Sequence, residues 1–189
     1  QSALRAVQGL SLSQEKLLQL KQLGICLNYN AYGESTQDLY WQPEELFLIL
    51  SSFKSPLAFI QERLDIYHAL SDAYEDDMSH AWQISPSYLS NQVAVFVLPE
   101  ARWARRVSGV WGNELVNRYP SRAHAVLSLN TQGGYTVSVR APLDNRSGAD
   151  VVCASFPSGG GRKAAAGITH LPLDQLGVFV DTLNKQYAV

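Results

Sequence analysis

The chain has 189 residues, of which 46% are hydrophobic and 17% are charged, and its formal net charge is −2. Such a length suffices for one large domain or two small ones, and the composition excludes disordered and collagen-like chains. No apolar run approaches the length of a membrane-spanning helix, so we expect no association with a membrane.

Charge is divided unevenly along the chain. Residues 1–91 carry five basic and eleven acidic side chains, a net −6, whereas residues 92–189 carry ten basic and six acidic side chains, a net +4. This asymmetry indicates two units, the second of which meets an anion, although solvated surface charge alone would also produce it.

The N-terminal stretch is predicted to be helical. Leucines at helical spacing follow Ser11 and Ser13, and either serine is an N-cap candidate. The helical spacing of apolar residues already includes the first residues of the chain, which begins at Gln1. This indicates a fragment of a longer protein or a complete protein that has been trimmed. The earliest apolar positions of this pattern are Leu4, Val7 and Leu10.

Two further helices are expected before a domain boundary. Asn28–Pro43 is rich in Asn, Gly and Ser and is predicted to be an ordered loop. One helix should begin after Pro43, and the next should run from Pro56 to about His80. Proline and serines in residues 83–91 separate two different patterns, so we assign residues 1–86 to a helical lobe and residues 87–189 to a second domain.

Strand and helix patterns alternate in the second domain. A buried strand ends at Pro99, and a helix with apolar residues three and four positions apart is stopped by Pro120. Two strands around TQGG form a hairpin, residues 150–156 are a short helix or strand, residues 166–172 are a last strand, and a closing helix starts at Pro172. We therefore predict an α/β (α+β) fold: a helical N-terminal lobe, then a compact α/β domain with a mixed sheet.

The segment SFPSGGGRKAAAGITH places three consecutive glycines beside Arg162 and Lys163. A bare loop is the simplest of four interpretations. A nucleoside-triphosphate P-loop is rejected, because Ala164 stands where a hydroxyl must reach magnesium. A dinucleotide-binding turn is disfavoured, because Gly167 and Pro172 leave no room for the long helix that it needs.

The fourth interpretation is an anion-binding turn. Successive glycine N–H groups would point into one concavity and hold a phosphate or carboxylate, with Arg162 and Lys163 adding positive charge. The alanines that follow would allow a short helix to pack behind the turn. Arg140 ends the strand VSVR and either supplies a bidentate contact to the anion or is an ordinary surface residue.

These residues resemble the DHH-associated C-terminal domain, which follows the catalytic part of DHH phosphoesterases such as RecJ-type exonucleases, oligoribonucleases and cyclic-dinucleotide phosphodiesterases. The family pattern is Ser-x-Arg on a strand, then Gly-Gly-Gly-His-x-x-Ala-Ala-Gly, and the resemblance covers about residues 92–189. Ser138 and Arg140 match the first part. The second part is matched by Gly159, Gly160, Gly161, Ala165, Ala166 and Gly167.

Two positions depart from the family pattern, and the first of them bears on chemistry. Arg162 stands where the family has histidine, and Lys163 stands where proline is frequent. The resemblance implies that the histidine position lies beside the substrate phosphate near a metal centre. Arginine can hold an anion there, but its high pKa makes it a poor general acid or base. The implied substrate- or phosphate-binding residues are Ser138, Arg140, Gly159, Gly160, Gly161, Arg162 and Lys163.

The catalytic half of the family carries Asp and His metal ligands, including the Asp-His-His that names it. No Asp-His-His occurs in this sequence, whose scattered histidines are His68, His80, His124 and His170. We therefore expect no catalytic residue and no metal ligand in this chain, and manganese in a missing N-terminal catalytic domain. The fragment alone should be inactive. We expect a cytoplasmic protein whose partner is a nucleotide or a short single-stranded nucleic acid, and the prediction allows a homodimer.

Two further hypotheses remain open. A glycine turn beside cations also suits a pyrophosphate, so a non-hydrolytic nucleotide- or acyl-CoA-binding module, similar to acyltransferases, is the alternative function. The other hypothesis is a scaffold that serves assembly only.

Several polar residues have competing roles. The first group is the cluster of Asn28, Tyr29, Asn30, Tyr32 and Glu34. It is either a polar binding site or an ordered loop whose hydrogen bonds are made by its own side chains. Arginines on one predicted helical turn either track a phosphate backbone or are solvated, and these are Arg102, Arg105 and Arg106. The pair Asp76–Asp77 is expected to solvate a helix end, and Cys26 and Cys153 are expected to be buried free thiols.

Overall fold

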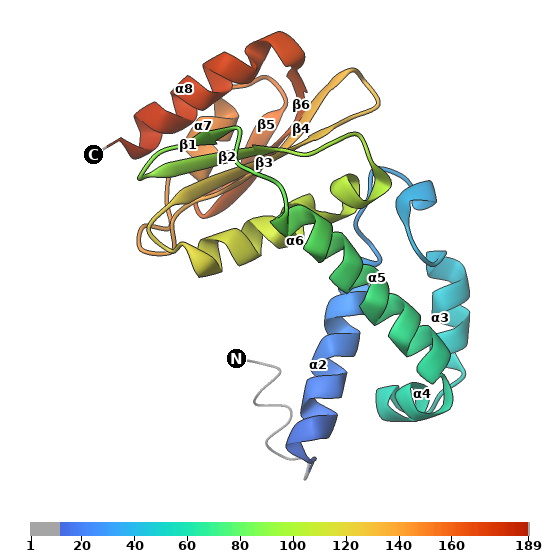
Figure 1. Ribbon diagram of the computed structural model, residues 1–189. Coiled ribbons are helices and arrows are strands. Elements are labelled where there is room, and N and C mark those ends of the chain that lie inside the picture. Colours follow the sequence, from blue (N-terminus) through green and yellow to red (C-terminus); the bar gives the residue numbers. More distant parts are fainter. Residues whose placement is uncertain (1–11, 189) are drawn as a thin grey trace. The chain divides into compact units, whose positions relative to one another are not determined.

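The computed structural model describes residues 12–188, so the pattern predicted over residues 1–11 lies outside them (Figure 1). Contacts divide the chain into two units. Of the described residues, the helical unit contains residues 12–32 together with Leu39–Asp76, and the sheet unit contains Gly33–Asp38 and residues 77–188. The boundary thus falls inside a helix, whereas the boundary that we placed from the sequence lies beyond that helix's end.

The helical unit is built from helices whose start signals are visible in the sequence. Ser13 caps the first helix by accepting a hydrogen bond from the Lys16 amide at 3.4 Å, and prolines begin the next two. The helix predicted from Pro56 to His80 is broken at Arg63, whose φ of −128° and ψ of 52° are not helical. The elements are α2 (Gln14–Tyr29), α3 (Pro43–Ser51), α4 (Pro56–Glu62) and α5 (Leu64–Trp82), and α5 continues into the sheet unit.

The sheet unit contains six strands in the order β1-β2-β3-β4-β6-β5. Only the pair β2–β3 is parallel, because α6 (Arg102–Arg118) crosses over between these two strands. The sheet is therefore mixed, which confirms the predicted fold class. The strands are β1 (Tyr88–Leu89), β2 (Val93–Val97), β3 (Ala123–Leu129), β4 (Gly134–Arg140), β5 (Gly159–Arg162) and β6 (Ala165–Pro172).

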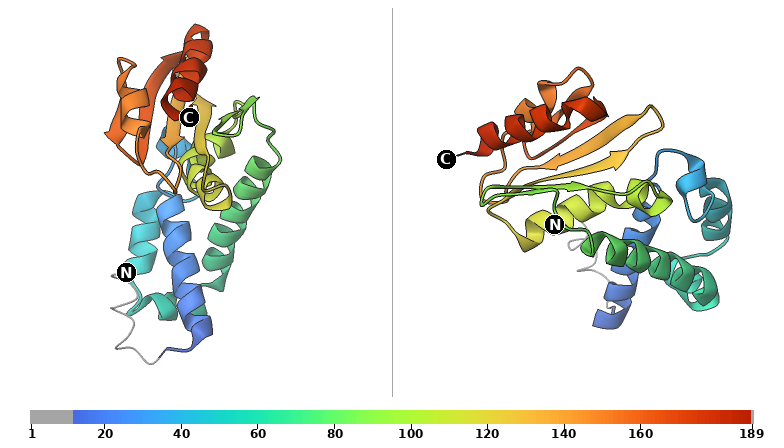
Figure 2. Two further views of the ribbon diagram at one scale, coloured as in Figure 1. Left: turned by 90° about the vertical axis from the view of Figure 1, so that its left-hand side faces the viewer. Right: turned by 45° about the horizontal axis from the view of Figure 1, so that its top comes forward.

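Helices cover the two faces of this sheet unequally. Helix α6 packs on β3 and β4 from one side, whereas α7 (Ala149–Ala154) and α8 (Leu176–Tyr187) cover the other side (Figure 2). Residues 150–156, for which the sequence allows helix or strand, thus begin in a helix, and a short 3-10 turn, Leu173–Gln175, precedes the closing helix. The core between the sheet and α7 and α8 includes Val137, Val139, Ala166, Ile168, Phe179 and Leu183.

Both cysteines are buried and free, as predicted. Burial raises the pKa of the Cys153 thiol to about 12, and burial also raises the pKa of the Cys26 thiol. Both thiols therefore stay protonated and unreactive at neutral pH. Among residues 12–188, no helix combines the length and the apolar character that crossing a lipid bilayer requires.

Candidate functional site

The glycine run is an edge strand and not a turn. Gly159–Arg162 forms β5 and pairs antiparallel with β6, and the turn between them is Lys163–Ala164. The alanines therefore begin a strand, and the short helix expected behind the glycines is absent from this described segment. Successive amides of a strand point in opposite directions, so the three glycine N–H groups do not converge on one anion. The proposed anion-binding turn was wrong in its geometry.

The three glycines have different reasons to be glycine. A Cβ on Gly159 would lie 1.8 Å from the Cys153 carbonyl oxygen, so this residue must be glycine for α7 to pack against β5. Gly161 has a φ of +147°, and its Cβ would lie 2.5 Å from the Ala166 Cα. Gly160 differs, because its Cβ would meet no atom within 4 Å. Neither backbone strain nor packing in the described chain explains glycine at position 160.

Register aligns the predicted binding residues in two rows across three strands. Ser138 on β4 pairs with Gly167 on β6, which pairs with Gly160 on β5. In the next row but one, Arg140 pairs with Ala165, and Ala165 pairs with Arg162. Residues two apart on a strand share one face, and so do directly opposite residues. We call this surface the open face: Thr136, Ser138, Arg140, Gly160, Arg162, Ala165, Gly167 and Thr169.

The open face lies on the α6 side of the sheet. The alternate residues of the same strands, such as Val137 and Ala166, are buried on the opposite side in the core beneath α7 and α8. On the open face, Ser138 and Arg140 are half-buried, and Gly160 and Arg162 are exposed. Small side chains on β6 and β5 thus leave the backbone of these strands accessible to a ligand.

Arg140 is held in place by α6. Its Nε donates to Asn113 Oδ1 at 2.7 Å, and its Nη2 donates to the Gly109 carbonyl at 3.1 Å. Its Nη1 donates to Ser138 Oγ at 2.9 Å, so the two residues of the Ser-x-Arg pattern contact each other. These bonds fix the guanidinium at the junction of α6 and the open face. A pocket of about 180 Å³ lies at this end of the face and is lined by Asn113, Arg140, Arg146 and Ala165, among others.

The two cations after the glycines lie at the sheet's edge. Arg162 is exposed, and no hydrogen bond or ion pair joins its side chain to any part of residues 12–188. Lys163 occupies the β5–β6 turn, where its carbonyl accepts a hydrogen bond from the Ala149 amide at 3.0 Å. The structure thus brings Ser138, Arg140, Gly160 and Arg162 onto one face, whereas Lys163 lies beyond the end of the strands.

The arginines of α6 have structural partners. Arg105 forms a bidentate pair with Asp38, whose Oδ1 lies 2.6 Å from Nη2 and 3.0 Å from Nε. Hydrogen bonds from Arg105 hold the pKa of the Asp38 carboxyl below its usual value. Arg106 donates to both carboxylate oxygens of Asp77 and is buried. Only Arg102 of the three is exposed, so the predicted phosphate-tracking arginines do not form a cationic row.

The described residues do not fit a manganese centre. One group of potential ligands lies within reach of a single ion, on one stretch of α5: Asp76, Asp77 and His80. Asp77 is buried and both of its oxygens accept hydrogen bonds from Arg106, which corrects the expectation that it solvates a helix end. His80 stacks on Trp103 with ring centroids 5.4 Å apart. A di-metal site needs several available carboxylates and imidazoles, and this group does not supply them.

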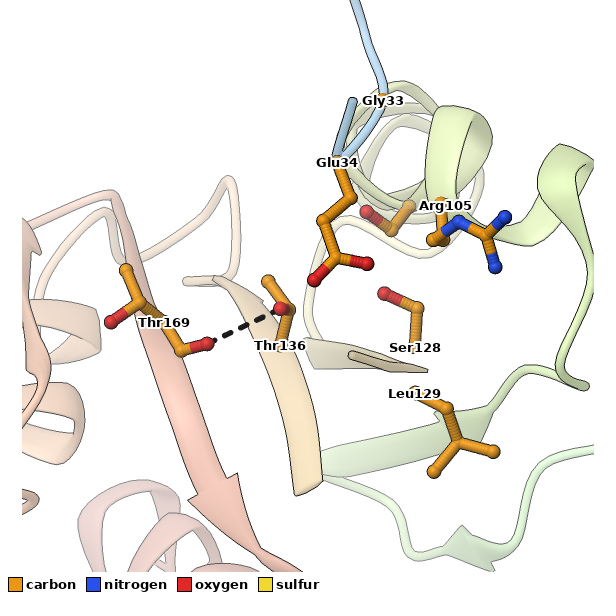
Figure 3. A pocket seen from close by; sticks show the side chains of 8 residues that line it. Gly33, Glu34, Arg105, Ser128, Leu129, Thr136 and Thr169 are labelled. Atoms are coloured by element: carbon orange, nitrogen blue, oxygen red, sulfur yellow. Dashed lines mark hydrogen bonds between the residues drawn. The ribbon is translucent and has the colours of Figure 1, made fainter. Parts of the chain in front are cut away.

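Sequence reasoning missed a pocket at the other end of the open face. The cavity has a volume of about 300 Å³, and Figure 3 shows Glu34 and Ser128 facing each other across it. Thr136 Oγ1 donates to the Thr169 carbonyl at 3.3 Å, at a bulge where Thr136 opposes two residues of β6. The lining residues are Gly33, Glu34, Arg105, Ser108, Ser128, Leu129, Thr136 and Thr169. They come from five separate segments, so no local motif reveals the pocket.

The polar cluster around the α2–α3 loop serves two roles. Asn30 fits the interpretation of a self-satisfied loop, because its side chain accepts from the Trp41 amide at 3.0 Å and donates to the Trp41 carbonyl at 2.8 Å. Glu34 belongs instead to the sheet unit. Its Oε1 accepts hydrogen bonds from the Thr131 amide at 3.0 Å and from the Thr131 hydroxyl at 2.9 Å.

Comparison with solved structures identifies the fold. The crystal structure of RecJ from Thermus thermophilus in complex with Mg²⁺ matches with a TM-score of 0.56 and 15% identity, over 88% of this chain and 28% of RecJ. CDC45 from Entamoeba histolytica matches with a TM-score of 0.55 and 11% identity, over 89% of this chain and 37% of CDC45. The pGpG-specific phosphodiesterase PggH from Vibrio cholerae matches with a TM-score of 0.55 and 12% identity, over 98% of this chain and 66% of PggH.

All three neighbours have DHH-family folds, so the fold predicted from the resemblance is confirmed. This chain spans between about a quarter and two thirds of the length of these proteins. No family model and no curated protein matches the sequence.

Proposed function

We propose that this chain, which has a DHH-family fold, is the substrate-binding portion of a metal-dependent phosphoesterase that acts on short oligonucleotides or cyclic dinucleotides. The observation that supports the proposal is the open face, where Gly160 leaves space unfilled between Ser138 and the exposed Arg162. Glycine within a strand, where neither strain nor packing requires it, is typical of a site that a ligand approaches closely.

The two arginines of the open face have complementary properties for binding phosphate. Arg140 is fixed by Asn113, Gly109 and Ser138, so little conformational entropy is lost when it contacts an anion. Arg162 lies two strands away in the same row and has its guanidinium exposed. Both side chains remain charged at any physiological pH. The guanidinium of Arg162 presents planar donor pairs that match phosphate oxygens, whereas Arg140, whose N–H groups bond to Asn113, Ser138, Val139 and Gly109, contributes a fixed positive charge.

Ser138 completes the proposed phosphate contacts. Its hydroxyl accepts a hydrogen bond from Arg140, and its own proton is thereby directed to another acceptor. A phosphate over Gly160 would lie between this hydroxyl and Arg162. We propose that Gly159, Gly161 and Lys163 contribute through the shape and charge of the edge strand.

Catalysis is proposed to require residues outside the described part of the chain. Arg162 cannot serve as a general acid or base, since its pKa lies far above neutrality. RecJ has been crystallised with Mg²⁺ and with manganese, and PggH is specific for pGpG. We propose that manganese bound to a separate catalytic domain activates water, while the open face holds the phosphate end of the substrate.

Titration of this chain with pGpG tests the proposal. We expect saturable binding, detected by isothermal calorimetry, and a loss of at least tenfold in affinity in Arg162→Ala. Lys185→Ala serves as the matched control, because Lys185 is an exposed cation of α8 on the opposite side of the sheet. Absence of binding by the wild-type chain, or equal loss in both variants, contradicts the proposal.

The acyl-CoA alternative loses its main support. It depended on a glycine turn that cradles a pyrophosphate, and the glycines form a strand instead. A parallel titration with coenzyme A separates the two functions, because the open-face proposal expects weaker binding of coenzyme A than of pGpG.

A further inference from the structure

The pocket at the Thr136 end of the open face contains polar groups that the described chain leaves without partners. Ser128 is 4% exposed, lines the pocket, and its hydroxyl makes no hydrogen bond within residues 12–188. Ser108 on α6 also lines the pocket and likewise lacks a hydrogen bond in the described chain. The oxygen of Ser128 is not among the buried side-chain atoms of the described chain that lack a partner, so it is open to the pocket, and both hydroxyls are available to hydrogen-bond a ligand that enters it.

Glu34 presents one unused carboxylate oxygen to the same space. Its Oε1 is saturated by the amide and hydroxyl of Thr131, whereas Oε2 has no partner among the described residues. Figure 3 shows the carboxylate extending from the loop over the pocket, toward Ser128. The two bonds from Thr131 hold Glu34 in this position, so the acceptor is preorganised.

The charge of the pocket disfavours phosphate. Among the lining residues Glu34 is the one acid and Arg105 is the one cation, and the guanidinium of Arg105 is already paired with Asp38, which does not line the pocket. Figure 3 shows that guanidinium directed away from Glu34. A neutral group with hydrogen-bond donors is therefore favoured over an anion. The volume of about 300 Å³ is typical of sites for small ligands.

We propose that this pocket binds a guanine base of the nucleotide whose phosphates contact the open face; the inference rests on the proposed function. Guanine presents two adjacent donors, N1–H and the N2 amino group, beside the acceptor O6. Glu34 Oε2 accepts from the donors, and the hydroxyls of Ser108 and Ser128 donate to O6. Adenine has an acceptor, N1, where guanine has a donor. Adenine N1 and the Glu34 carboxylate would therefore be two acceptors facing each other, with no hydrogen bond between them.

The spacing of the two sites suits one ligand. Thr136, Ser138 and Arg140 lie on the same face of β4, and the strand rise places Thr136 about 7 Å from Ser138 and about 13 Å from Arg140. A base in the pocket therefore leaves its sugar and phosphates directed along the open face toward Gly160 and the two arginines.

The test compares pGpG with pApA, which carry the same phosphates and differ in their bases. For the wild-type chain we expect calorimetry to show at least tenfold tighter binding of pGpG. Glu34→Gln should remove most of this preference, because an amide oxygen accepts more weakly from guanine and the amide NH2 can donate to adenine N1. Glu44→Gln, at an exposed glutamate on α3, is the matched control. Ser128→Ala provides a second variant that spares the Thr131 contacts and should weaken pGpG binding severalfold.

The outcomes separate the inference from the function on which it rests. Equal affinities for pGpG and pApA overturn the guanine pocket and leave phosphate binding on the open face intact. A preference for pGpG that survives in both Glu34→Gln and Ser128→Ala also overturns the pocket assignment. If neither dinucleotide binds, the proposed function fails and the inference fails with it.

Discussion

Arg106 holds both carboxylate oxygens of Asp77, with Nε 2.7 Å from Oδ2 and Nη2 2.9 Å from Oδ1. The side chains are 7% and 1% exposed, so the pair is shielded from water. Arg106 also donates to the Asp38 carbonyl at 2.6 Å. The pair therefore joins the end of α5 and the Gly33–Asp38 segment to α6 within the sheet unit.

Asp77→Ala is expected to lower the free energy of unfolding by about 3–5 kcal/mol, because it leaves the Arg106 guanidinium buried without its counter-ion. Urea denaturation followed by circular dichroism measures the change. Asp65→Ala is the control, because Asp65 pairs with Arg63 at 2.8 Å on the exposed surface and its loss should leave the midpoint unchanged. The double variant Asp77→Leu with Arg106→Met should be less destabilised than Asp77→Ala; equal or greater loss would contradict this account.

Much of the fold could be predicted from local patterns. The spacing of apolar residues predicts α6. Gly-Gly between two stretches with the pattern of strands predicts the β3–β4 hairpin. Strand β5 was missed because glycine has no side chain and therefore no hydrophobic period; pairing with β6 creates the strand. The break at Arg63 was also missed, since no proline or glycine marks it.

The candidate site shows the same division between local and long-range information. Ser138 and Arg140 share a face because they are two residues apart on a strand, which the sequence predicts. Their alignment with Gly160 and Arg162 depends on β6 lying between β4 and β5, and no local signal specifies that order. Glu34 is held at the pocket by the amide of Thr131, in the turn between β3 and β4, which donates to its carboxylate. The two residues are far apart in the sequence, so no local pattern predicts this contact.

The glycines at positions 159 and 160 should respond oppositely to alanine. Gly159→Ala is expected to destabilise the sheet unit strongly, since its Cβ would lie 1.8 Å from the Cys153 carbonyl oxygen. Gly160→Ala should leave stability unchanged or raise it by about 0.5 kcal/mol, because alanine loses less conformational entropy on folding. If Gly160 is glycine to admit a phosphate, the same variant should weaken pGpG binding at least tenfold. A stable Gly160→Ala variant that binds pGpG normally would exclude position 160 from the site.

The contribution of Arg162 should depend on salt. An exposed cation that neutralises one phosphate releases condensed counterions, so log K falls as log salt rises. For single strands, loss of one such cation makes this negative slope less steep by about 0.7. We expect this decrease when a short oligonucleotide is titrated with Arg162→Ala between 50 mM and 200 mM salt, about the range over which such slopes are measured. Lys185→Ala on α8 should retain the wild-type slope. A slope that is equal in all three proteins would show that Arg162 does not contact phosphate.

His124 should make stability depend on pH. The imidazole is 1% exposed, neither ring nitrogen has a hydrogen-bond partner in the described chain, and Tyr119 stacks on it. Burial, with a smaller effect of Arg122, lowers the pKa of His124 from 6.5 to about 4. The folded state therefore binds this proton less readily than the unfolded state, and protonation favours unfolding.

The free energy of unfolding should thus be fully retained above pH 6.5 and should fall by about 3 kcal/mol as the pH drops from 6.5 to 4. Urea denaturation at intervals of half a pH unit measures this dependence. His124→Leu removes the titrating group and should flatten the curve over that interval, whereas His68→Leu, at an exposed position, should not. Carboxylates titrate in the same range in every variant, so the difference between the two variants isolates His124. A His124→Leu curve parallel to that of the wild type would show that the buried imidazole is not the origin of the acid sensitivity.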